Sequence, residues 1–269
     1  MNRIIRNLGL DELQLLLDWA GREGWNPGLG DAAPFCAADP RGFFGAFVGQ
    51  TMVAGMAAVA YDDSFGFIGL YICHPDWRGQ GHGRAVWDAG MAYLGNRTIG
   101  LDGVPEQQAN YARMGFVTAY GSVRMSGRLT AAQPAPSPTT ATPEAIAALD
   151  AACFPAARPD FLRHWTSPPH GLILAERHGQ LAGYAVTRPC LDGSKIGPLF
   201  ARDINVALDM LDRIQGPIQI DVPTAQTDWL AALAQRGLTA GFATARMYRG
   251  AAPAIAMARV FGITSLELG

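Results

Sequence analysis

The stretch Ile68–Arg84, which reads IGLYICHPDWRGQGHGR, decides how the rest of the chain is interpreted. Its apolar first part predicts a short buried strand, and the residues after it predict an amphipathic helix. Between the two, Gly79, Gly81 and Gly83 alternate with larger residues. Glycine lets the backbone approach a ligand without an intervening side chain. The stretch therefore predicts a strand, a ligand-binding turn and a helix in direct succession.

Such a turn is suited to an anion. Successive N–H groups at the start of a helix attract phosphate, and the helix dipole reinforces them. Arg78 and Arg84 add positive charge on either side of the turn. The third glycine comes one residue too early for G-x-G-x-x-G, and no Gly-Lys-Ser/Thr follows. A dinucleotide or ATP site is therefore disfavoured.

The turn resembles the pyrophosphate-binding motif of the GNAT superfamily of N-acetyltransferases, Arg/Gln-x-x-Gly-x-Gly/Ala after a strand that ends Val-x-Pro. Here Cys73 takes the place of the valine, and the motif itself runs from Arg78 to Gly83. Tyr111–Phe116, which reads YARMGF, is similar to the family's Tyr-x-x-x-Gly-Phe. The matches lie in the family's usual order between Phe43 and Met125.

The resemblance implies an acetyl-CoA-dependent enzyme that acetylates a primary amine by direct attack. Backbone N–H groups of Gln80 to Arg84 are expected to hold the pyrophosphate, and the amides of Ile72 and Cys73 to bind pantetheine or polarise the thioester carbonyl. Tyr111 is expected to protonate the departing thiolate, since ordinary tyrosine and thiol pKa values, about 10 and 8.5, lie close together. The cofactor-binding residues implied are Ile72, Cys73, Arg78, Gly79, Gln80, Gly81, His82, Gly83 and Arg84.

The general base and the acceptor site are less clearly marked. Glu23 and Asp63 are the bases that we predict, and the other acidic candidates are Asp31, Asp62 and Asp102. A wall for the acceptor is expected from the segment around Trp25, and the substrate-binding residues predicted are Trp25, Asn26, Asp31 and Asp102. Structural alternatives remain open: a solvated turn at Asp62-Asp63, a tight turn around a buried Trp25, and a packing role for Tyr111.

The chain divides at a proline-rich segment. Four prolines fall at 134, 136, 138 and 143, which excludes a helix or a central strand there. We predict domains at 1–129 and 144–269, joined by a linker at 130–143. Landmarks recur on both sides at offsets of 119 to 122 residues, as in Asp102 and Asp221 or Met125 and Met247. Such a long-period repeat indicates a duplicated domain.

Each half alternates strands with helices. We therefore predict an α/β (α+β) fold of two tandem GNAT-like domains, each a mixed, mostly antiparallel sheet flanked by helices. The second half lacks the glycine turn. Its corresponding strand is followed by Ala201-Arg202-Asp203 instead. This half is expected to bind no pyrophosphate and to wall the acceptor cleft or bury a domain interface.

The composition of the chain limits the kinds of binding partner that we expect. Apolar residues make up 49% of the 269 residues and charged residues 16%, with a net charge of −2, so nucleic acid is not expected as a partner. The sequence shows no signal peptide, no membrane span, no metal-ligand cluster and no paired cysteines, and a cytoplasmic monomer or homodimer is expected. Two functions stay open beside acetylation of a small amine or amino-acid-like molecule: an acyl-CoA sensor without catalysis, and a protein lysine or N-terminal acetylase.

Overall fold

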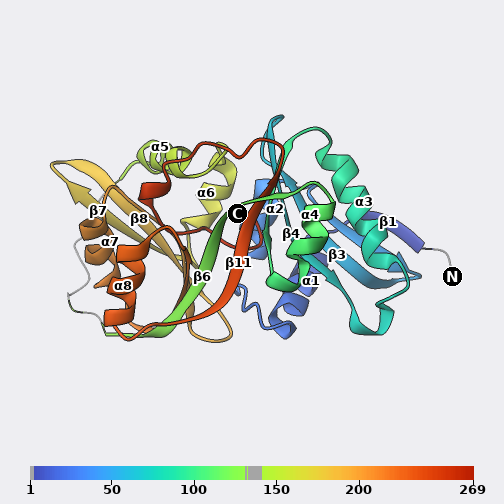
Figure 1. The fold of residues 1–269 in the computed structure, drawn as a ribbon, viewed down its shortest axis with the longest axis horizontal. Helices are drawn as coiled ribbons and strands as arrows, with labels where there is room; N and C mark the ends of the chain where they lie inside the picture. Colours follow the sequence, from blue (N-terminus) through green and yellow to red (C-terminus); the bar gives the residue numbers. More distant parts are fainter. Residues whose placement is uncertain (1–2, 131, 133–140) are drawn as a thin grey trace.

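The computed structural model describes residues 3–130, 132 and 141–269, and most of the predicted linker lies outside them. Figure 1 shows the two halves side by side, with the N-terminal half in blue to green and the C-terminal half in yellow to red. The elements of the first half are β1 (Arg3–Asn7), α1 (Leu10–Arg22), α2 (Ala32–Ala38), β2 (Phe43–Val48), β3 (Thr51–Ala60), β4 (Phe65–Cys73), the short 3₁₀ helix η1 (Pro75–Trp77), α3 (His82–Leu94), β5 (Thr98–Gly103), α4 (Pro105–Arg113) and β6 (Val117–Leu129). Those of the second half are α5 (Pro143–Cys153), α6 (Pro159–Trp165), β7 (Gly171–Arg177), β8 (Gln180–Pro189), β9 (Ser194–Ala201), α7 (Ile204–Leu211), β10 (Gly216–Pro223), α8 (Thr227–Gln235), β11 (Thr239–Arg249), the 3₁₀ helix η2 (Met257–Arg259) and β12 (Val260–Gly262).

One continuous sheet runs through both halves. Its strand order is β1-β2-β3-β4-β5-β11-β6-β10-β9-β8-β7, and β12 pairs with β9 away from this path. Only β4 with β5 and β9 with β10 are parallel, and the other pairs are antiparallel. The predicted mixed, mostly antiparallel sheet flanked by helices is thus confirmed.

β6 of the first half and β11 of the second half are exchanged. β11 lies between β5 and β6, and β6 lies between β11 and β10. Each half therefore completes its sheet with a strand from the other, and Figure 1 shows β6 and β11 side by side at the centre of the molecule. The two strands share a short motif, Val123–Met125 in β6 and Ala245–Met247 in β11, and this motif does not specify which half each strand pairs with.

Helices cover both faces of the sheet. Alternate residues of β2 show this: Phe43 and Phe47 join a core with α1, α2, α5 and α6, whereas Phe44 and Ala46 join a core with α3. The first of these cores spans both halves. At its centre, Phe35 of α2 stacks on Trp165 of α6 with ring centroids 5.8 Å apart. The two halves therefore share apolar packing as well as strands.

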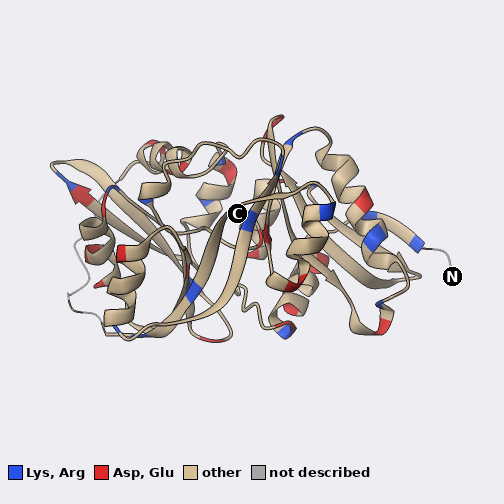
Figure 2. Ribbon diagram, viewed as in Figure 1, with Lys and Arg blue, Asp and Glu red and all other residues tan. Residues whose placement is uncertain are grey.

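Charged residues are interspersed along both halves of the described chain (Figure 2). Among the described residues no helix is long and apolar enough to cross a membrane. Within the same residues, no group of His, Cys, Asp and Glu gathers as metal ligands would.

Candidate active site

The site begins where two parallel strands separate. β4 and β5 pair from Phe65 and Thr98 as far as Ile68 and Leu101. Beyond that point β4 continues to Cys73 along β3 alone. Leu70 has a positive φ of 48°, and the register with β3 shifts beside it, so the strand carries a bulge. The bulge turns β4 away from β5 and opens a gap between them.

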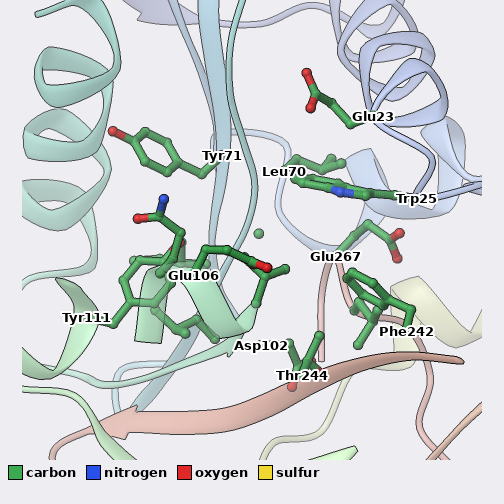
Figure 3. A pocket seen from close by; sticks show the side chains of 16 residues that line it. Glu23, Trp25, Leu70, Tyr71, Asp102, Glu106, Tyr111, Phe242, Thr244 and Glu267 are labelled. Atoms are coloured by element: carbon green, nitrogen blue, oxygen red, sulfur yellow. The ribbon is translucent and has the colours of Figure 1, made fainter. Parts of the chain in front are cut away.

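A cavity of about 580 Å³ occupies this gap, a size typical of small-molecule sites. Figure 3 shows Tyr71 and Tyr111 on one side of it and Trp25, Glu267 and Phe242 on the other. The lining residues are Glu23, Trp25, Ile68, Gly69, Leu70, Tyr71, Leu101, Asp102, Val104, Glu106, Gln107, Tyr111, Phe242, Thr244, Leu266 and Glu267. Both halves of the chain therefore build one cavity.

Two glycines of the turn adopt a backbone conformation that favours glycine. Gly79 and Gly81 have φ values of 76° and 78°, and Gly81 is the residue that caps the N-terminus of α3. A Cβ on Gly79 would meet nothing within 4 Å, and one on Gly81 would meet only the Arg3 guanidinium, at 3.8 Å. The start of α3, a helix of 13 residues, is thus open at the turn, as an anion-binding site requires.

Side chains around the turn hold it in place. Arg78 donates to the carbonyl of Cys73 at 3.0 Å and to the carboxylate of Glu23 at 2.6 Å, so it links the turn to the segment after α1. Arg84 is paired with Asp88 one helical turn further on, at 2.8 Å. Gln80 donates its side-chain amide to the carbonyl of Asp76 at 3.3 Å. Both arginines therefore have carboxylate partners in the structure.

Three further residues of the predicted cofactor site are mostly packed. Ile72 is buried at the end of β4, and the ring of His82 lies edge-on to Trp77 with centroids 5.5 Å apart. Burial raises the pKa of the Cys73 thiol, and the N–H of Gly83 and the charge of Arg78 offset this in part. The Cys73 thiol is therefore protonated at neutral pH.

Tyr111 lies in α4 and faces the cavity from the side of β4 (Figure 3). Its ring stacks on Trp87 of α3, with centroids 5.7 Å apart and planes 20° apart. Burial, and to a smaller extent the nearby Tyr71, raise the pKa of Tyr111 to about 12. The hydroxyl consequently holds its proton throughout the physiological range.

Trp25 forms the opposite wall, and buried cations fix it there. Its carbonyl accepts hydrogen bonds from Lys195 Nζ at 2.7 Å and from Arg124 Nη1 at 3.2 Å. Arg124 also lies over the ring of Phe242, 5.4 Å from its centroid. The second half thus positions the segment after α1 that was expected to wall the acceptor.

Asp102, predicted to bind substrate, lines the cavity but already has a partner. Arg246 of β11 donates to its two oxygens at 2.9 and 2.8 Å. Burial raises the pKa of Asp102, and Arg246 opposes that rise. The carboxylate is therefore held by the exchanged strand, which a sequence reading of the first half does not reveal.

Three residues predicted for the base or the acceptor site do not border the cavity, and neither do the nine predicted cofactor-binding residues. Asp63 lies fully exposed on a surface turn, 3.5 Å from Arg97. Asp31 is completely buried, where Arg188 and the N–H of Gly28 bind its carboxylate. Asn26 binds the backbone of Asp192 in the second half. These side chains have structural partners elsewhere and do not line the cavity.

The lining residues that the sequence did not indicate come from both halves. Phe242 and Thr244 reach the cavity from β11, and Leu266 and Glu267 from the segment after β12. Tyr71 and Glu106 belong to the first half. Tyr71 lies within the motif-bearing stretch, and its alternation along β4 with the buried Ile72 was the one signal that could have identified it.

The corresponding gap in the second half is filled by the chain itself. β9 and β10 pair in parallel only as far as Ile196 and Ile220. There β12 inserts: it pairs with β9, and Ile263 just after it donates its N–H to the carbonyl of Asp221 in β10, at 2.9 Å. A Cβ on Gly197 of β9 would lie 2.3 Å from the carbonyl oxygen of Thr264. No open gap like that between β4 and β5 is left between these two strands.

Comparison with known sequences agrees with this duplicated architecture. Residues 10–116 match the acetyltransferase (GNAT) family, and residues 146–262 match an acetyltransferase (GNAT) domain. The chain is 33% identical to holothin acyltransferase from Pseudoalteromonas sp. (strain SANK 73390), over 97% of this chain and 92% of that protein. It is 29% identical to the uncharacterized N-acetyltransferase YitH of Bacillus subtilis, over 63% of this chain and 64% of that protein.

Solved structures with the same fold include other tandem proteins. A proposed acetyltransferase from Pyrococcus horikoshii superposes with a TM-score of 0.79, at 19% identity, over 99% of this chain and 96% of that one. A tandem GNAT protein from the clavulanic acid biosynthesis pathway superposes with a TM-score of 0.63, at 15% identity, over 94% of this chain and 100% of that one.

The chain belongs to the GNAT family of acetyltransferases, as a member with two GNAT domains in tandem. It is an acyltransferase.

Proposed function

We propose that the protein is an N-acetyltransferase that moves an acetyl group from acetyl-CoA to a primary amine of a small molecule. The observation that carries this proposal is the cavity between β4 and β5. Tyr111 lines it on the first-half side, aromatic and acidic residues line its other side, and the glycine turn follows β4 along the chain. A cavity of about 580 Å³ is of the size that small-molecule sites have, which favours a small acceptor.

The first half has the features that binding of acetyl-CoA requires. The open N-terminus of α3 and the positive-φ glycines at 79 and 81 form a cradle for the pyrophosphate. The gap between β4 and β5 accommodates the pantetheine arm beside Ile72 and Cys73. When bound, acetyl-CoA supplies an activated thioester carbonyl. Backbone amides of the diverging strand polarise that carbonyl.

Tyr111 acts as the general acid in this proposal. Its pKa of about 12 is higher than the ordinary value assumed from sequence, so transfer of its proton to a thiolate of ordinary pKa about 8.5 is uphill. The donation is favourable only when it is coupled to the proton that leaves the amine nitrogen. Tyr111 therefore protonates the sulfur and regains a proton as the amide forms.

The acceptor lies on the side of Trp25 and Phe242, as their position opposite Tyr71 and Tyr111 suggests (Figure 3). Aromatic side chains there offer an apolar surface to a flat or hydrophobic acceptor. The relative holothin acyltransferase is named for holothin as its acceptor, and for this chain we propose a small-molecule amine.

An assay over a panel of primary amines tests the proposal. The protein is mixed with acetyl-CoA and each amine in turn, and free thiol and acetylated amine are measured together. We expect both products, in equal amounts, with at least one small amine. Binding of acetyl-CoA without turnover of any amine would favour the acyl-CoA sensor instead, and acetylation of peptides alone would favour a protein acetylase.

A further inference from the structure

The end of the chain runs from the second half into the cavity of the first. After β12 has filled the gap in the second half, the chain reaches β4, where a Cβ on Gly69 would lie only 2.0 Å from the carbonyl oxygen of Glu267. The hydroxyl of Tyr61 donates to the carbonyl of Leu268 at 2.8 Å. Gly69 and Tyr61 thus fix the backbone on both sides of the Glu267 side chain.

Glu267 carries a buried carboxylate. Its residue is 2% exposed, and it lines the cavity on the side of Trp25 and Phe242 (Figure 3). Within the described chain, its Oε2 atom has no hydrogen-bond donor. Burying an ionised carboxylate without hydrogen bonds costs several kcal/mol in order of magnitude. A fold that keeps this group unpaired at the wall of a ligand cavity indicates that a ligand provides the partner.

The other carboxylates around the cavity are already engaged or more exposed. Asp102 is bound by Arg246, and Glu23 is bound by Arg78 and is partly exposed. Glu106, in the first turn of α4, is exposed. Tyr71 and Tyr111 are the remaining titratable groups of the lining, and burial raises the pKa of each.

Two cations lie close enough to be affected by the charge of Glu267. One is Arg124, which forms an ion pair with Asp221 at 2.8 Å. The other is Lys195, the only lysine of the chain, which donates to the carbonyl of Trp25. Burial lowers the pKa of Lys195. Neither cation lies within hydrogen-bond distance of Oε2, so each neutralises Glu267 only from a distance.

We propose that Glu267, a residue of the second half, binds the ammonium group of the acceptor and takes its proton. This inference rests on the proposed function and assigns the base to Glu267 in place of the predicted Glu23 and Asp63. It also explains why the second half is retained although its own gap is closed: it contributes the acid–base group to the active site of the first.

The ammonium nitrogen loses two protons in the proposed reaction. The Glu267 carboxylate takes one proton from the ammonium group and leaves the nitrogen with a free electron pair. That pair forms the C–N bond as the C–S bond of the thioester breaks, and the sulfur takes the proton of Tyr111. The second proton lost by the nitrogen returns to Tyr111, and Glu267 releases its proton to solvent.

Glu267→Gln is the variant that tests this role. It keeps the shape of the side chain and removes a buried charge, so it should fold with a melting temperature at or above that of the wild type. The panel includes benzylamine, which is protonated at neutral pH, and aniline, which is not. We expect kcat/KM for protonated amines to fall about 10²-fold at neutral pH and to recover as the pH approaches the pKa of the amine.

A control substrate and two further variants are measured beside Glu267→Gln. For the Glu267→Gln variant, kcat/KM with neutral amines such as aniline should fall little, because these amines have no proton to give before attack. Glu267→Asp should recover part of the activity and keep the pH profile of the wild type. Glu176→Gln, which removes an exposed carboxylate in β7, should change nothing. Affinity for acetyl-CoA should stay within about twofold in every variant, because the cofactor lies on the other side of the cavity.

The outcomes separate the two proposals. An equal loss for benzylamine and aniline, or wild-type kcat/KM in a folded Glu267→Gln protein, overturns the role of Glu267 and leaves acetylation intact. Absence of product with every amine in the wild type, with acetyl-CoA still bound, overturns the proposed function and the role of Glu267 with it.

Discussion

Asp102 of β5 and Arg246 of β11 form a two-pronged ion pair across the boundary between the two halves, with N–O distances of 2.9 and 2.8 Å. Both side chains are almost completely buried, and Arg246 also lies over the ring of Phe67, 4.8 Å from its centroid. The pair joins the strand that leads into the active site to the strand received from the other half. Stability and site geometry are therefore linked at this point.

Removal of either partner of this ion pair should lower the free energy of unfolding. Asp102→Leu leaves the Arg246 guanidinium buried without its counter-ion, and we expect a loss of about 3–5 kcal/mol in the free energy of unfolding. Arg246→Met should cost a similar amount. The double variant should recover much of the loss, because it leaves no isolated charge. Urea unfolding of the four proteins measures this cycle, and additive losses in the double variant would contradict the coupling.

The strand exchange leads to a second prediction, about fragments. In a fragment of residues 1–129, β6 would lack both neighbours, β10 and β11, and β5 would lack β11. We expect this fragment alone to be aggregated or largely unfolded, because an unpaired apolar edge is a template for association. Co-expression with residues 141–269 should restore a soluble complex that binds acetyl-CoA. Cooperative unfolding of a monomeric 1–129 fragment would contradict this.

A third prediction concerns the number of acetyl-CoA molecules bound. The gap of the first half is open and that of the second is filled by β12, so calorimetry should show one site per chain. Two sites of similar affinity would refute the assignment. The site should also depend on Gly81, where a branched side chain at φ 78° strains the turn by about 1–2 kcal/mol or more.

Gly81→Val should therefore weaken acetyl-CoA binding about tenfold or more. Gly95→Val is the matched control, because Gly95 has a φ of 60° and follows the other end of the same helix. It should lose stability and keep its affinity for acetyl-CoA. A similar loss of affinity in both variants would show that general strain in α3, and not the turn, is responsible.

The local part of this architecture was predictable from sequence. A strand, a turn of alternating glycines and a helix follow one another along the chain, so the positive φ of Gly79 and Gly81 needs no partner from elsewhere. The duplicated mixed sheet also follows from short-range patterns that recur at a constant offset. Family resemblance then gave the chemistry of this segment.

The long-range part was not predictable from the same patterns. β6 and β11 have equivalent sequences in a duplicated chain, and the choice of partner depends on the assembled interface. The tail around Glu267 carries no motif, and only its course past Gly69 brings the carboxylate to the cavity. Asp31 was predicted to bind substrate because an acid in a glycine-rich loop suits an amine, but a buried arginine of the second half, Arg188, binds it.

The last prediction concerns Tyr111. Tyr111→Phe keeps the ring that stacks on Trp87 and removes only the hydroxyl. If this hydroxyl is the general acid, kcat should fall about 10²–10⁴-fold while the affinity for acetyl-CoA changes little. Tyr93→Phe is the control, because the Tyr93 hydroxyl binds Asp39 outside the cavity, and its loss should affect stability alone.

The pH dependence sharpens this test. Burial raises the pKa of Tyr111 to about 12, which favours the protonated form. As the pH rises from neutral, the wild type should therefore lose no activity through ionisation of Tyr111 until the pH approaches that value. In an ultraviolet titration, the difference between the wild type and Tyr111→Phe should show one phenol ionising about two units above the ordinary pKa of about 10. Wild-type kcat in a folded Tyr111→Phe protein would mean that Tyr111 is a packing residue and that the sulfur takes its proton from water or from another group at the cavity wall.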